Sequence, residues 1–193
     1  MNLKNYWISK LIAILGIFFL NSANADVKLK ASQQVSNFLI QIKNFAAEKD
    51  QLKKVKQSEQ LLKLIDIEFM SKATVGKQWE KVAYVEKNIY KKELFGKFMQ
   101  FIDLHLEDFK EIKFKEKSVK LRGQKLVYVT GSIDTKKIKN LNITWKLSSK
   151  ENKLLDVEIE KISLIKTQRL EMKPLLKKHK NNFSQFIKIY FSN

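Results

Sequence analysis

The chain contains no cysteine, which excludes several kinds of protein. Its 193 residues offer no thiol nucleophile, no thiolate metal ligand and no disulfide to hold the fold. Histidine is almost as scarce: His105 lies in an apolar helical pattern and His179 among lysines, so neither has the spacing of a metal ligand. The five glycines form no phosphate-binding loop. We therefore expect a protein that is not an enzyme and that uses no metal or cofactor; a hydrolase would need a general base that we do not find.

Arginine is nearly absent from a strongly basic chain. All but two of the 38 basic residues are lysines, against 20 acidic residues, and the formal net charge is +18. Two interpretations stay open. The lysine excess reflects genome composition, or it draws the protein towards anionic membrane surfaces and acidic partners.

Long apolar runs are also missing after the first 25 residues. Lys4 and Lys10 precede an apolar run over residues 11–20, and the small residues Ala23 and Ala25 follow it. This pattern predicts a secretory signal peptide, residues 1–25, cleaved after Ala25. The run is too short for a membrane anchor, which needs about 20 apolar residues. We expect export to the periplasm of a Gram-negative bacterium, where nucleic acid is not a partner, and a single domain over residues 26–193.

The mature part of the chain changes its periodicity twice. Residues 27–49 carry apolar side chains at helical spacing, a second apolar segment runs from Leu61 to Trp79, and a third, aromatic helix begins near Glu86. Alternating segments typical of strands begin near Glu111. The expected division is a helical part over 26–110, a strand-rich part over 111–165 and C-terminal helices over 166–193.

The stretch from Leu154 to Arg169 organises the predicted fold. Leu155, Val157 and Ile159 alternate with three acidic residues, which predicts a strand with one dry and one solvated face. From Ile162 the spacing suits a helix. With three earlier strands in sequence, the simplest arrangement is an antiparallel meander. The predicted fold class is therefore α+β, with a curved antiparallel sheet of about four strands packed with helices.

Two blocks of sequence resemble the MlaC, or toluene-tolerance, family. Residues 65–79, with Asp66, Gly76 and Trp79, are similar to one helix of that family, and residues 156–169 are similar to its strand and Val-Ser-Leu-x-x-x-x-Arg helix start. The chain departs from the family pattern in having Lys161 where members carry glycine. The resemblance implies a nuclear-transport-factor-like sheet and a periplasmic phospholipid carrier, with acyl chains in an apolar cavity. It also implies shuttling between an outer-membrane lipoprotein and porin complex and an inner-membrane ABC transporter with an MCE-domain protein, which would maintain outer-membrane lipid asymmetry.

The candidate lipid-binding residues are inward-facing strand positions and apolar helical positions: Val75, Trp79, Phe98, Phe101, Val127, Val129, Ile143, Trp145, Val157, Ile159 and Leu164. Each could equally be ordinary core. Arg169 is a candidate for a headgroup or gate residue, or for a structural ion pair with Glu158 or Glu160. Two other functions stay open: a periplasmic chaperone or lipoprotein carrier, and a carrier of another apolar lipid, for example one associated with hopanoids. Transient contact with a membrane surface is expected in either case.

Overall fold

The computed structural model describes residues 3–179 and 182–192, with side chains from Asn24 onward. Most of the predicted signal peptide, residues 1–23, has side chains that lie outside the described residues, so the signal peptide stays a prediction. The helices have these bounds: α1 Leu3–Ala47, α2 Gln51–Lys63, α3 Ile67–Val75, the 3-10 helix η1 Gly76–Lys81, α4 Tyr84–Leu104, α5 Leu106–Lys110, α6 Leu164–Lys178 and α7 Phe183–Phe191. Among the residues with described side chains, no helix is long and apolar enough to cross a membrane.

Five strands form one antiparallel sheet in sequence order: β1 Lys113–Arg122, β2 Leu126–Asp134, β3 Leu141–Ser148, β4 Leu154–Ile159 and β5 Ile162–Ser163. Every neighbouring pair is antiparallel, as short connections between consecutive strands favour. The α+β prediction with an antiparallel meander is confirmed. Its fourth strand is followed by a two-residue fifth strand, so the helix begins at Leu164 and not at Ile162.

The strict alternation predicted for strand β4 is wrong at two positions. A register shift opposite Lys146 and Leu147 places Leu155 out of line with Val157 and Ile159. Asp156, which was predicted to face water, is only 6% exposed. Both faces of the beginning of β4 are therefore covered, because helices pack where the pattern indicated solvent.

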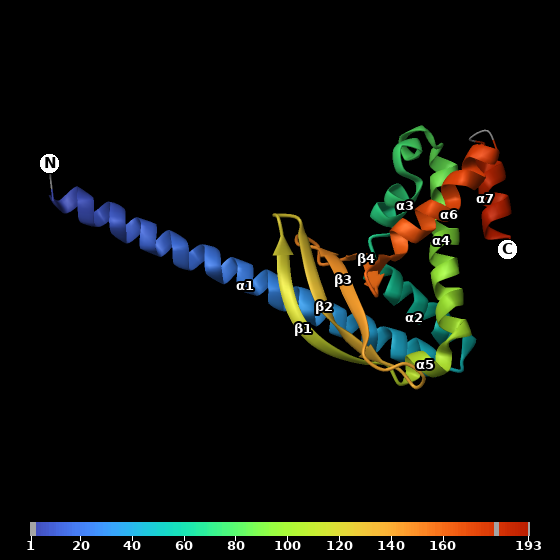
Figure 1. Ribbon diagram of the computed structural model, residues 1–193, viewed down its shortest axis with the longest axis horizontal. Helices are drawn as coiled ribbons and strands as arrows, with labels where there is room; N and C mark the ends of the chain where they lie inside the picture. The colour runs from blue at the N-terminus through green and yellow to red at the C-terminus, as the bar shows by residue number, and fades with distance from the viewer. Residues whose placement is uncertain (1–2, 180–181, 193) are drawn as a thin grey trace.

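The sheet and α1 form the first of two hydrophobic clusters. Figure 1 shows α1 passing along the sheet, with α2 and α5 beside the C-terminal part of α1. Val35, Phe38 and Ile42 of α1 belong to one buried cluster with Val127 and Trp145 of the sheet. The amphipathic stripe of α1 thus buries the apolar face of the strands.

The second cluster lies among α4, α6 and α7. Tyr90 of α4 is fully buried, and its hydroxyl hydrogen-bonds to Thr74 Oγ1 at 2.9 Å and donates to Met172 Sδ at 3.0 Å. Burial raises the pKa of Tyr90, so the phenol stays neutral. Phe186 and Tyr190 stack at 5.3 Å between ring centroids. Helices α3, α4, α6 and α7 are therefore one packed unit beside the sheet (Figure 1).

Candidate functional site

The first cluster presents a continuous apolar surface on the inner face of the sheet. Val127, Val129, Ile143, Trp145 and Val157 are each at most 9% exposed and belong to this one cluster. They come from β2, β3 and β4, where the register pairs Val129 with Trp145 and Trp145 with Val157. These five predicted lining residues thus lie together on three adjacent strands, because alternate positions on paired strands share a face.

An aromatic residue of α1 occupies the centre of this surface. The Phe38 ring lies 5.5 Å from the Trp145 ring in an edge-to-face arrangement and 6.2 Å from the Phe98 ring. Phe114 of β1 contacts Trp145 from another side, with ring centroids 6.3 Å apart. Phe38 therefore joins the sheet to α4. Helical spacing predicts that Phe38 belongs to an amphipathic helix but does not say what that helix covers.

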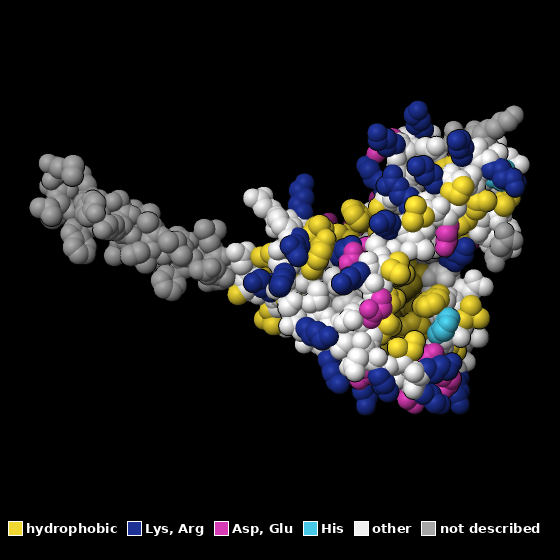
Figure 2. Space-filling view, viewed as in Figure 1, with side chains coloured by type: hydrophobic (Ala, Val, Ile, Leu, Met, Phe, Trp, Pro, Cys, Tyr) yellow, Lys and Arg dark blue, Asp and Glu magenta, His cyan; other side chains and the backbone are white. Residues whose placement is uncertain are grey.

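The margin of the cluster is open beside α4. Phe98 and Ile159, two of the predicted lining residues, are half-buried against this cluster, together with Met70 of α3. Figure 2 shows a hollow lined by hydrophobic side chains between the sheet and α4, and we call it the apolar hollow. Two surface pockets of about 440 and 300 Å³ lie elsewhere and are lined by none of the predicted residues.

One polar atom in this apolar surface is unpaired. The indole N–H of Trp145 is buried and finds no hydrogen-bond acceptor among the described residues. An unsatisfied buried donor costs about 1–3 kcal/mol, and native cores contain few of them. The position is therefore one where an acceptor atom from a ligand would gain a hydrogen bond.

Four predicted residues lie away from the inner face of the sheet. Trp79 is buried and Val75 is half-buried in the second cluster, while Phe101 and Leu164 are 50% and 43% exposed. Trp79 donates to Glu68 Oε1 at 3.1 Å, and Lys91 bonds the other oxygen at 2.9 Å. The Lys91 hydrogen bond holds the pKa of Glu68 below its usual value. Trp79 and Val75 thus lie in a different cluster from the sheet residues, because periodicity finds buried faces without saying which cluster buries them. A lipid-binding role for these four residues stays a prediction.

Arg169 does not form the predicted ion pair. Glu158 pairs with Lys146, and Glu160 accepts hydrogen bonds from Asn142. Within residues 24–179 and 182–192, no carboxylate lies within ion-pair distance of Arg169, which is exposed. Its guanidinium instead lies against Gly76: a Cβ built there would be 2.8 Å from Nη2. The two blocks that carry the family resemblance therefore meet, through Gly76 of one and Arg169 of the other.

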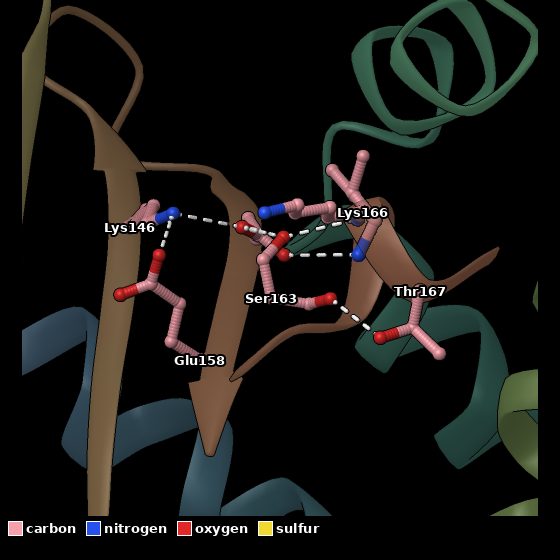
Figure 3. Close-up of polar contacts among 7 residues, drawn as sticks. Lys146, Glu158, Ser163, Lys166 and Thr167 are labelled. Carbon is pink, nitrogen blue, oxygen red and sulfur yellow. Dashed lines mark hydrogen bonds and ion pairs between the residues drawn. The ribbon is translucent and has the colours of Figure 1, made fainter. Parts of the chain in front are cut away.

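A polar network fixes the turn from β4 into α6 (Figure 3). Asp156 accepts from Ser163 Oγ at 2.7 Å, from the Ile165 backbone N–H at 3.2 Å and from Lys146 Nζ at 3.0 Å. Ser163 caps α6 by accepting from the Lys166 backbone N–H. Burial would lower the pKa of Lys146, but its hydrogen bonds to Glu158 and Asp156 raise it overall. The network holds the start of α6 against β3 and β4.

The described residues contain no cluster of histidines and carboxylates that could bind a metal. The site that remains is apolar, with one unpaired donor at its centre and an opening beside α4. Such a surface can hold a nonpolar ligand.

Comparison with known proteins gives two findings. The family model described as MlaC protein matches residues 30–189. A solved structure of a phospholipid-binding protein from Ralstonia solanacearum, determined in complex with a phospholipid, aligns with a TM-score of 0.69 at 11% identity, over 86% of this chain and 99% of the other. At that identity the likeness shows the fold, and no curated protein matches the sequence significantly. Since the family model spans most of the chain, the protein belongs to the MlaC family.

Proposed function

We propose that this protein is a periplasmic phospholipid carrier, which binds acyl chains against the inner face of the sheet. The observation that carries the proposal is the single apolar surface of β2, β3 and β4, which opens into the apolar hollow beside α4 (Figure 2). The MlaC family and the phospholipid held by the Ralstonia solanacearum neighbour support this ligand class.

Carriage of this kind needs no catalytic residue. Two acyl chains carry roughly 30 methylenes, each worth ~0.8 kcal/mol when removed from water. A free-energy cost of roughly 24 kcal/mol therefore opposes passage of the lipid through water. Transfer from a bilayer into an apolar site exchanges one dry environment for another, with little net cost. We infer that lipid passes directly between docked partners. The proposed partners are an inner-membrane MCE-domain protein of an ABC transporter and an outer-membrane lipoprotein and porin complex.

Room for the acyl chains requires a rearrangement of α1 or α4. Phe38 lies between Trp145 and Phe98, where a ligand against the inner face of the sheet would lie. We propose that lipid enters through the apolar hollow and displaces this ring contact. An ester oxygen of the lipid is then a suitable acceptor for the Trp145 indole N–H.

The proposal is tested by native mass spectrometry of the protein recovered from the periplasm of an expressing bacterium, followed by lipid extraction. We expect a mass increment equal to one diacyl phospholipid, and an N-terminus at Asp26 that defines the processed chain. A protein that is empty and takes up no lipid from anionic vesicles would overturn the proposal. The chaperone or lipoprotein-carrier hypothesis would then replace it.

A matched pair of variants locates the lipid. Ile159→Trp places a larger side chain at the margin of the sheet cluster and removes space for about two methylenes, which predicts an about tenfold loss of lipid affinity. Ile138→Trp makes the same replacement at a position that is 50% exposed, outside the sheet cluster, and should leave lipid occupancy unchanged. Equal occupancy in both variants would contradict the location.

A further inference from the structure

Helix α6 presents a regular basic stripe on its outward face. Lys166, Leu170, Lys173 and Lys177 recur at intervals of four, three and four residues, and all four side chains are exposed. At 3.6 residues per turn this spacing aligns them along one side of the helix. The opposite side carries Met172 and other residues of the second cluster. We call the four residues the α6 stripe.

The charge of the α6 stripe is not neutralised by the protein itself. In residues 24–179 and 182–192, no carboxylate lies within ion-pair distance of its three lysines. The single acidic residue of the helix, Glu171, accepts a hydrogen bond from the Tyr190 hydroxyl at 3.3 Å, on the side towards α7. The stripe therefore carries a net positive potential into the solvent.

The surroundings of the stripe add positive charge and apolar contact. Arg169 extends from the same helix to Gly76, and Lys77 is exposed in the adjoining turn. Leu170 is 64% exposed at the centre of the stripe, and Ile162 is 62% exposed beside the start of the helix. Figure 2 shows lysine and arginine side chains gathered over α6 and its neighbours, with apolar side chains between them.

We propose that the α6 stripe is a docking surface for a bilayer that contains anionic lipid. Lysines carry compact charges on flexible stems, and several of them around an exposed apolar residue match a plane of lipid phosphates with acyl chains beneath. Leu170 gains contact with the acyl boundary, and each lysine gains about a fivefold increase in partition, equivalent to ~1 kcal/mol. A bilayer provides both phosphates for the lysines and, directly beneath them, an apolar layer for Leu170.

The α6 stripe is separate from the proposed lipid site. The stripe lies on the outer face of α6, whereas the inner-face residues of the sheet, such as Trp145 and Val157, belong to the other cluster. Replacement of stripe residues should consequently leave bound lipid unchanged. Failure of docking and failure of lipid binding are therefore distinguishable.

The test is cosedimentation of the periplasm-recovered protein with phosphatidylcholine vesicles that contain either no or roughly one-third phosphatidylglycerol. We expect binding to the anionic vesicles only, weakened as salt shortens the screening length. The triple variant Lys166→Gln, Lys173→Gln, Lys177→Gln should bind about a hundredfold more weakly. Leu170→Ser should reduce binding at every salt concentration, because it removes the apolar contact.

The matched control replaces three exposed lysines on α2: Lys53→Gln, Lys56→Gln and Lys63→Gln. It lowers the net charge equally and should retain vesicle binding. An equal loss in both triple variants would overturn the proposal in favour of general attraction by net charge. Absence of wild-type binding, or a Leu170→Ser variant that binds as well as the wild type, would also overturn it and favour an acidic protein partner. Thermal unfolding of each variant verifies that it is folded.

Discussion

Glu160 and Lys161 adopt positive φ angles of 48° and 67°, although neither is glycine. They form the two-residue connection between β4 and β5, where Ile159 pairs with Ile162. A two-residue hairpin with a type I′ turn requires positive φ at both central residues, which favours asparagine and glycine. For other L-residues this conformation costs about 1–2 kcal/mol. The departure from the family pattern at Lys161 thus falls on a position with a steric reason for glycine.

Lys161→Gly should therefore stabilise the protein, by about 1 kcal/mol in the free energy of unfolding. The same replacement at Lys56, an exposed position inside α2, should destabilise it by about the same amount, because glycine lowers helix propensity. Urea denaturation of the two variants measures both effects. A Lys161→Gly variant less stable than the wild type would show that the turn geometry is different.

At the scale of elements, the turn from β4 into α6 depends on Asp156. This carboxylate holds Lys146 of β3, Ser163 at the cap of α6 and the backbone of Ile165 together (Figure 3). A buried carboxylate with three partners is stabilising only while all three remain paired. Asp156 therefore fixes the orientation of α6 relative to the sheet, and with it the direction in which the α6 stripe faces.

Asp156→Asn should lower the free energy of unfolding by about 2–3 kcal/mol, because it leaves a partly buried lysine with one carboxylate and introduces amide hydrogens beside donors. Glu107→Gln is the matched control, since it breaks an exposed pair with Lys110 and should leave stability unchanged. Chemical denaturation compares the two. Similar small effects in both variants would mean that the network does not carry the turn.

At the scale of the whole molecule, like charges dominate. With 38 basic and 20 acidic residues, self-repulsion opposes the compact state, and the ten ion pairs formed by the described residues leave most lysines unpaired. Repulsion between exposed charges acts over the Debye length, which falls from about 30 Å at 0.01 M salt to about 8 Å at 0.15 M.

Stability should therefore rise with salt over this range, since screening weakens the many repulsions more than the few exposed ion pairs. Urea unfolding midpoints in sodium chloride between roughly 0.01 and 0.15 M measure the effect. Potassium chloride serves as the control for a specific sodium effect. A midpoint that falls with added salt would show that attractive pairs outweigh the net positive charge.

The sequence by itself determined the order and type of the elements. Alternation in residues 141–147 and in the strands around it predicts an antiparallel meander, because period-two burial is a local property of extended backbone. The five sheet residues of the candidate site could be found in the same way, since paired strands bring alternate residues onto one face. The family resemblance was readable for a similar reason, as its motifs are contiguous in sequence.

Only the tertiary structure decided which apolar faces meet. Periodicity shows that Phe38 and Trp79 are buried but cannot show that one packs on the sheet and the other in a separate cluster of α4, α6 and α7. The same limit applies to Asp156 and Arg169, whose partners depend on the distances between elements and not on spacing along the chain. Hydrophobic burial is non-directional, so a sequence pattern specifies a buried face while the packing of whole elements selects its partner.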